Sequence, residues 1–194
     1  MSAVLVKRYE APTFCATDAL RYAGCREAEP SSAALLEACR AELWEQLRYA
    51  VCYCELPLTV RGDVCDFGDF SLKSADLARY FGECRRAVLF AATVGVAPDR
   101  LITKYSRVAP AKALMMQAIG AERIEALCDA FCDEWAALPS RFSPGYGDLP
   151  LEAQREVFRV LRPERAIGVC LNESLLMSPS KSVTAFLGIK GEKQ

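Results

Sequence analysis

The sequence contains no histidine among its 194 residues. This absence excludes catalysis by Ser–His or Cys–His pairs, and it excludes histidine as a ligand to zinc or iron. Any reaction in which the chain takes part must therefore proceed without an imidazole from this chain. A role in binding or positioning does not require one.

The cysteines lack a metal-binding pattern, although ten are present: Cys15, Cys25, Cys39, Cys52, Cys54, Cys65, Cys84, Cys128, Cys132 and Cys170. No Cys-x-x-Cys motif occurs, and no signal peptide indicates an oxidising compartment. Cys52 and Cys54 would share one face of a strand, and Cys128 and Cys132 one face of a helix, but each pair supplies only two ligands. We interpret the cysteines as reduced, buried thiols and expect no metal site.

The chain also lacks a charge excess and a long apolar segment. Lys and Arg total 24 while Asp and Glu total 25, which argues against a nucleic-acid surface or a site for acidic membranes. The apolar run at residues 87–97 is too short to span a bilayer, and residues 1–12 have no signal-peptide core. These features predict a soluble cytoplasmic protein. The length and the 52% apolar content suit a single domain, residues 1–194, with a buried core.

Hydrophobic periodicity predicts an α+β fold with a mixed, mainly antiparallel sheet and helices packed on it. Helices are expected at residues 18–23, 30–47, 75–83, 98–105, 110–138 and 151–161, with a loosened turn expected at Gly120 of the fifth. Strands are expected at residues 49–60, 64–70, 86–96, 166–171 and 182–189, and the last two are expected to be neighbours. Ser74 is the expected N-cap of the third helix, and Pro57 is expected on an edge strand or at a strand end.

A row of acidic residues follows one face of the fifth predicted helix: Glu122, Glu125, Asp129 and Asp133. The apolar stripe of the same helix lies on a different face. From the residues alone, such a row is a solvated acidic face.

The stretch Arg141-Phe142-Ser143-Pro144-Gly145-Tyr146 combines groups with distinct uses. The Arg141 guanidinium is a planar fork of donors that fits a carboxylate or a phosphate. Pro144 restricts the backbone, Gly145 permits positive φ, and Tyr146 adds an aromatic surface with a hydroxyl. On composition alone, the stretch is a tight turn that follows a helix.

Two blocks together resemble the activation (reactivation) domain of cobalamin-dependent methionine synthase. The first is the Arg-x-x-x-Gly-Tyr pattern at residues 141–146. The second is residues 172–185, which follow the family's order of Thr-Glu-Ser, Met, Pro and Ser-Val-Ser-Gly. The match is good over residues 141–186 and weaker back to residue 85. On this resemblance, residues 85–190 form the activation-domain-like core, and residues 1–84 form an N-terminal portion of helices and strands.

The resemblance implies binding of S-adenosylmethionine. Arg141 would bind the methionine carboxylate, and the backbone at Ser143 would contact the adenosine part. Gly145 and Tyr146 would complete the set of ligand-binding residues in this loop, with Tyr146 facing the cobalamin. Asp129, in the run Leu-Cys-Asp-Ala-Phe, matches an acidic residue that faces the ligand in the family. Glu173 and Ser174 lie in the second block, and we assign them a structural role in preference to a contact with the ligand.

The implied function is to support reductive methylation of oxidised cob(II)alamin, with this chain as the reactivation component of methionine synthase. The component would not be active alone. The cobalamin would be carried by a partner, because this chain has no histidine for the lower axial position, and a carrier such as flavodoxin would supply the electron. Two alternatives stay open. The chain could serve another corrinoid methyltransferase, or it could be a structural interaction domain that binds no ligand.

The sequence departs from the family in several places. The segment before Arg141 is shortened to residues 134–140, and no tyrosine follows Tyr146. Asn172 replaces the usual Thr, and Ala185 replaces the usual Gly. An aspartate of the family's N-terminal arm has no evident counterpart. These departures suggest that ligand binding is weak unless a partner completes the pocket.

Overall fold

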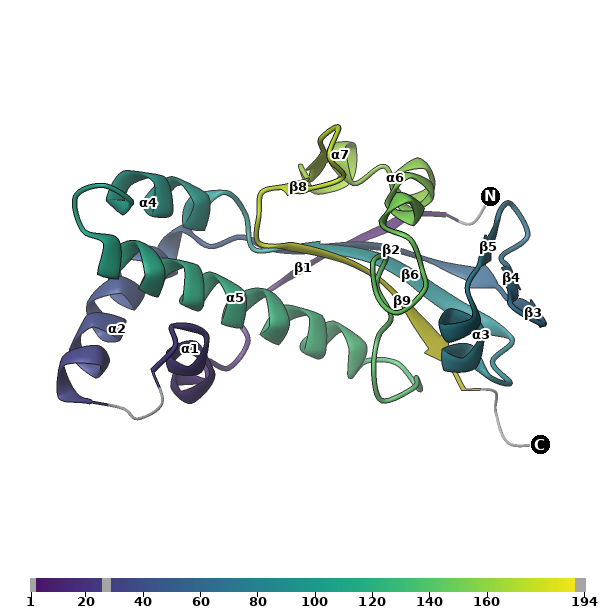
Figure 1. The fold of residues 1–194 in the computed structure, drawn as a ribbon, viewed down its shortest axis with the longest axis horizontal. Helices are drawn as coiled ribbons and strands as arrows, with labels where there is room; N and C mark the ends of the chain where they lie inside the picture. The colour runs from purple at the N-terminus through teal and green to yellow at the C-terminus, as the bar shows by residue number, and fades with distance from the viewer. Residues whose placement is uncertain (1–2, 26–28, 191–194) are drawn as a thin grey trace.

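A four-stranded antiparallel sheet with the order β1-β2-β6-β9 forms the centre of the computed structural model, which describes residues 3–25 and 29–190 (Figure 1). Its strands are β1 Leu5–Tyr9, β2 Tyr49–Pro57, β6 Arg86–Thr93 and β9 Ser182–Ile189. β6 pairs with β2 on one side and with β9 on the other along its whole length. Because successive side chains of a strand point to opposite faces, this central strand supplies two separate cores.

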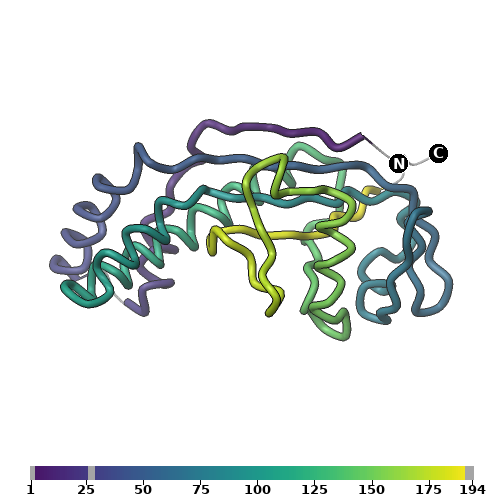
Figure 2. Tube along the Cα trace, turned by 90° about the horizontal axis from the view of Figure 1, so that it is seen from above, coloured from purple at the N-terminus to yellow at the C-terminus, as the bar shows by residue number. Residues whose placement is uncertain are grey.

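The longest helix, α5 Pro110–Cys132, covers one face of the sheet. Val88, Phe90 and Ala92 of β6 point to this face and are fully buried against α5. Three further helices complete this core: α1 Ala16–Tyr22, α2 Pro30–Leu43 and α4 Ala97–Tyr105. Figure 2 shows α2 and α4 gathered at one end of an elongated molecule.

The opposite face buries the alternate residues of β6, namely Ala87, Leu89 and Ala91. It is covered by α3 Ala75–Phe81, by α6 Gln154–Leu161, and by a three-stranded sheet of β3 Thr59–Arg61, β4 Val64–Asp66 and β5 Ser71–Lys73. The remaining elements are short: η1 Trp44–Gln46, η2 Leu151–Ala153, α7 Pro163–Ala166, β7 Cys170–Leu171 and β8 Met177–Ser178. The α+β fold with antiparallel sheets confirms the predicted fold class.

Several local predictions are confirmed. The Ser74 side chain accepts a hydrogen bond from the backbone N–H of Leu77 at 3.0 Å and caps α3. Pro57 is the last residue of β2. Cys52 and Cys54 share the buried face of β2 that points toward α6.

The prediction for residues 166–171 is wrong. These residues form the end of α7 and a turn, and only Cys170–Leu171 pairs, with β8 rather than with β9. Pro163 begins the short helix, and Gly168 has a φ of +73°, which turns the chain before a long strand can form. β9 pairs instead with β6, whose eight residues match its own length.

Two further predictions need correction. The fifth helix ends at Cys132 rather than near Leu138, and it runs without a break through Gly120. A methyl group at Gly120 would lie 3.0 Å from Cγ of Lys181, so this glycine makes room for the lysine side chain. The predicted strand at residues 64–70 divides into β4 and the start of a turn that leads to β5.

The cysteines are buried only in part. Six thiols are buried as expected, at Cys39, Cys52, Cys54, Cys65, Cys84 and Cys128. Cys25 and Cys132 are half-buried, and Cys15 and Cys170 are exposed, so the prediction of uniform burial is wrong. Exposure of the last two follows from their positions at a helix start and in a short hairpin.

Candidate functional site

The loop that contains Arg141 and Tyr146 is bonded to the edge strand β9. Phe142 and Phe186 exchange two backbone hydrogen bonds, of 2.9 Å and 2.8 Å. Within the loop, Gly145 donates to the carbonyl of Leu149 at 2.9 Å. Gly145 has a φ of +89°, a value that favours glycine, so the sequence selects this turn locally. The loop is thereby held at the edge of the sheet beside α5.

Arg141 forms ion pairs with two carboxylates from successive turns of α5. Its Nη1 donates to Oδ1 of Asp129 at 2.8 Å, and its Nη2 donates to Glu125. The Arg141 side chain is 19% exposed, so most of its surface is covered although it lies in a loop. Burial alone lowers the pKa of its guanidinium, but the neighbouring Cys128, Glu125 and Asp129 outweigh burial and raise it. We call Arg141, Glu125 and Asp129 the Arg141 cluster.

A small cavity of about 170 Å³ lies against this cluster. Ser143 and Tyr146 of the loop line it, together with Arg141 and Glu125. The other walls come from β8, from the start of β9 and from the start of α6: Met177, Ser182, Val183, Thr184 and Gln154. Thr184 and Gln154, both buried, share a hydrogen bond of 2.6 Å.

A larger cavity of about 530 Å³ lies between α5 and the chain from Pro12 to Tyr22. Glu125 lines both cavities, so the two share a wall at the Arg141 cluster. The acidic side chains along the larger cavity are Asp18, Glu122, Glu125, Asp129 and Asp133. We call it the acidic groove.

A buried ion pair fixes the far wall of the acidic groove. Arg123 is fully buried and Glu122 is 3% exposed, and the two side chains pair with each other. Arg123 donates to the carbonyls of Pro12 at 2.6 Å and Thr13 at 2.7 Å, and Glu122 accepts from the backbone N–H of Cys15 at 2.9 Å. The interpretation of Glu122 as part of a solvated acidic face is therefore wrong.

The sequence-predicted residues come together only in part. Arg141, Asp129, Ser143 and Tyr146 all lie around the two cavities. Gly145 does not line either one, and it lies in a separate depression beside α3. Glu173 and Ser174 are in the turn between β7 and β8, outside both cavities. This turn is closed by the Asn172 side chain, which accepts from the N–H of Leu176 at 2.9 Å.

Sequence reasoning missed Glu125, Asp18 and Gln154 as residues of the site. The spacing of four between Glu125 and Asp129 was a usable signal, since it places both on one side of a helix. Nothing in the local sequence around Asp18 or Gln154 connects them to residue 141. In the described ranges 3–25 and 29–190, no three His, Cys, Asp or Glu residues gather where they would hold a metal ion. Those ranges also contain no helix long and apolar enough to cross a membrane.

Comparisons with known proteins yield a match in structure. Neither models of known protein families nor the curated proteins match the chain. Among solved structures, the crystal structure of the MetH reactivation domain bound to AdoHcy superimposes with a TM-score of 0.76 at 14% sequence identity. The alignment covers 100% of this chain and 80% of that one. The resemblance inferred from residues 141–146 and 172–185 is thus confirmed at the level of the fold, and this chain has the fold of the MetH reactivation domain.

Proposed function

We propose that this chain binds S-adenosylmethionine at the Arg141 cluster and acts as the reactivation component of a cobalamin-dependent methionine synthase. The observation that carries the proposal is the position of this cluster on the wall shared by the two cavities. The AdoHcy bound to the structurally similar MetH domain supports the same class of ligand. The combined size of the cavities is within the usual range for a small-molecule site.

The charges of the cluster suit the amino-acid end of the ligand. That end carries one carboxylate and one ammonium. The ligand carboxylate would accept hydrogen bonds from the Arg141 guanidinium. Arg141 would then release Asp129 or Glu125, whose side chain would pair with the ligand ammonium. Binding therefore exchanges one set of ion pairs for another and leaves no charge of the cluster without a partner.

The acidic groove suits a ligand with a net positive charge. Asp18 is paired with Arg21 at 2.9 Å, and Glu122 is paired with Arg123. Of the other carboxylates that line the groove, Glu125 and Asp129 share the single guanidinium of Arg141, and Asp133 adds a further negative charge. S-adenosylmethionine carries an extra positive charge on its sulfonium, whereas AdoHcy does not. The groove should therefore favour the methyl donor over the product left after transfer.

The loop supplies the surfaces for the rest of the ligand and for the partner. Ser143 lies in the small cavity, where its backbone would contact the adenosine part. Tyr146 lines the same cavity and is 58% exposed, so its ring would cover the ligand and face the cobalamin of a docked partner. Gly145, which lines neither cavity, would contribute by shaping the turn that positions these two residues.

A chain without histidine is suited to this reaction. The sulfonium of the ligand would supply an activated methyl group and leave as a neutral thioether. The cobalamin of the partner, with an electron from a carrier such as flavodoxin, would supply the metal chemistry. The residues of this chain would hold the donor in position and exclude water, which requires no proton transfer. The partner would be a methionine synthase without its own reactivation domain, or another corrinoid methyltransferase.

One observation favours a second candidate, an interaction domain that binds no ligand. Arg141, Glu125 and Asp129 already satisfy one another. If these ion pairs are more stable than the ion pairs that a ligand could form, the cluster serves only to attach the loop to α5.

Titration calorimetry with S-adenosylmethionine, with and without a cobalamin-binding fragment of methionine synthase, tests the proposal. We expect binding that is tightened by the fragment, and weaker binding of AdoHcy. Absence of heat in both titrations would favour the interaction domain. Recovery of bound proteins from a lysate, tested for their corrinoid content, would distinguish a methionine synthase from another corrinoid methyltransferase.

A further inference from the structure

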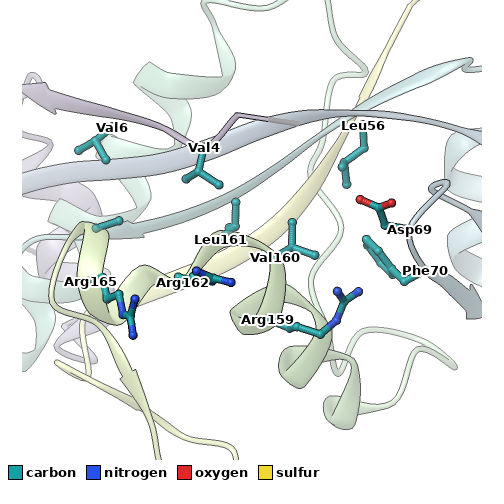
Figure 3. Close-up of a pocket in the computed structure, with 11 residues that line it drawn as sticks. Val4, Val6, Leu56, Asp69, Phe70, Arg159, Val160, Leu161, Arg162 and Arg165 are labelled. Carbon is teal, nitrogen blue, oxygen red and sulfur yellow. The ribbon is translucent and has the colours of Figure 1, made fainter. Parts of the chain in front are cut away.

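A third cavity lies on the opposite face of the sheet, at its other edge. It has a volume of about 440 Å³ and lies between β1, β2 and the chain from α6 to α7 (Figure 3). It shares no residue with the acidic groove or with the small cavity beside Arg141. Its lining residues are Val4, Val6, Leu56, Asp69, Phe70, Arg159, Val160, Leu161, Arg162, Arg165 and Ala166.

The inner wall of this cavity is apolar. Leu56 of β2 and Leu161 of α6 are buried, and Val4 and Val160 lie beside them with partial exposure. In Figure 3, Val4 on one side faces Val160 and Leu161 on the other. Val6 of the edge strand β1 extends this wall and is 48% exposed. An aliphatic chain laid along this wall would remove apolar surface from water, which is favourable in proportion to the area covered.

Three arginines line the rim at intervals of three residues: Arg159, Arg162 and Arg165. Arg159 is already occupied, because it pairs with Glu156 at 2.7 Å and its guanidinium lies 5.8 Å from the centre of the Phe70 ring. Arg162 and Arg165, by contrast, form no ion pair with any residue in the described ranges 3–25 and 29–190. The guanidinium groups of Arg162 and Arg165 therefore lie at the rim of an apolar cavity and can donate hydrogen bonds to a ligand.

The backbone at Arg162 explains why these two side chains lie on the rim. Arg162 has a φ of +47° and a ψ of +53°, a left-handed conformation that favours glycine. It separates α6 from α7, and its carbonyl accepts hydrogen bonds from the N–H groups of Arg165 and Ala166. An arginine in this conformation places a long cation where a glycine would fit the backbone better.

The charges along the cavity give it a direction. Figure 3 shows Arg162 and Arg165 toward one end, near Val4 and Val6, and Asp69 toward the other end, near Leu56 and Phe70. A negatively charged group is attracted to the first end, where Arg162 and Arg165 lie. The wall between the two ends is the apolar one formed by Val160 and Leu161.

We propose that this cavity binds an organic anion with an apolar body, of the class of medium-chain aliphatic carboxylates. The carboxylate lies on Arg162 and Arg165, where a guanidinium fork matches its geometry. The aliphatic chain lies along Val4, Val160 and Leu161. The concave shape and the volume of the cavity fit one small molecule and not the surface of a bilayer.

The experiment uses decanoate below its micellar concentration, followed by calorimetry and by the rise in melting temperature. We expect saturable binding that weakens at least about tenfold in the double variant Arg162→Gln/Arg165→Gln, because two charge-assisted hydrogen bonds are lost. Arg155→Gln, on the preceding helix α6 and outside the cavity, is the control and should bind like the parent. Decanol, which keeps the chain but not the charge, should bind more weakly than decanoate by a similar factor.

Three results would overturn the proposal. One is absence of decanoate binding at millimolar concentration. Another is equal binding of decanoate by the parent and the double variant, or of decanoate and decanol by the parent, which would indicate apolar adsorption only. The third is binding to anionic lipid vesicles without binding of monomeric decanoate, which would identify a membrane-surface site. A circular dichroism spectrum like that of the parent would show that the variants are folded, as expected for exposed arginines.

Discussion

Arg141 and Asp129 are twelve positions apart in the chain, and their side chains form an ion pair with an Nη1–Oδ1 distance of 2.8 Å. In the proposed site, these two residues hold the two charged groups of the amino-acid end of the ligand, Arg141 its carboxylate and Asp129 its ammonium. Their direct contact means that the site is assembled with its charges compensated. Each proposed role then predicts how binding changes when one member of the pair is altered.

Arg141→Lys should weaken binding of S-adenosylmethionine by about ten- to a hundredfold, or about 1.5–3 kcal/mol, as measured by calorimetry. An ammonium keeps the charge but cannot form the two parallel hydrogen bonds of a guanidinium. Decarboxylated S-adenosylmethionine lacks the group that Arg141 should hold, so the variant should lose little further affinity for it.

The matched control for this change is Arg86→Lys. Arg86 is paired with Glu55 at 2.9 Å on the surface and lines neither cavity of the proposed site, so its replacement should leave binding unchanged. Arg141 is partly buried, so its replacement should also lower the free energy of unfolding by about 1 kcal/mol. If the parent binds the ligand and Arg141→Lys binds it equally well, Arg141 does not hold the carboxylate.

Asp129→Asn and Glu125→Gln should each weaken binding of S-adenosylmethionine more than binding of AdoHcy. Each change removes one negative charge from the acidic groove, and only the methyl donor carries the sulfonium charge. The difference should shrink as salt is raised from 0.05 M to 0.5 M, since these carboxylates are partly exposed. Equal losses for both ligands would contradict the role of the groove charge, and Glu55→Gln serves as the control.

Arg123→Met should destabilise the protein by about 3–5 kcal/mol in urea unfolding. The change leaves Glu122 as a buried charge without its partner, and it frees the carbonyls of Pro12 and Thr13. The double variant Glu122→Gln/Arg123→Met should recover part of the loss. A single variant as stable as the parent would show that this pair does not anchor the wall of the acidic groove.

The free energy of unfolding should fall as the pH rises above about 9. Burial raises the pKa of the Cys52 thiol from 9.0 to about 12. Between these values the unfolded state loses the proton while the folded state keeps it, so the stabilising contribution is complete below pH 9 and is lost toward pH 12. Cys52→Ala should therefore reduce the pH slope between pH 9 and 11 by up to about 1.4 kcal/mol per unit. The exposed Cys170→Ala should leave the slope unchanged.

The sequence by itself determined the features that depend on neighbouring residues. The near-continuous apolar run at β6 predicted a strand buried on both faces, and Ser74 predicted the start of α3. Pro144 and Gly145 predicted the turn after Arg141, because their backbone preferences are local. Hydrophobic periodicity predicted the α+β fold, and the two blocks predicted the resemblance to the reactivation domain that the structural comparison confirms at the level of the fold.

Only the tertiary structure decided which distant residues meet. The sequence predicted residues 166–171 as the neighbour of β9, but β9 pairs with β6. The pairing of strands depends on the length and burial of both partners. The sequence placed Glu122 in a solvated acidic row. In the structure, α1 and the chain before α1 cover Glu122, and Arg123 compensates its charge. Tertiary contacts also place Glu125, Asp18 and Gln154 at the site. Residues far apart in the chain are brought together by burial of the apolar faces of α5 and the sheet, and no local pattern of residues encodes that contact.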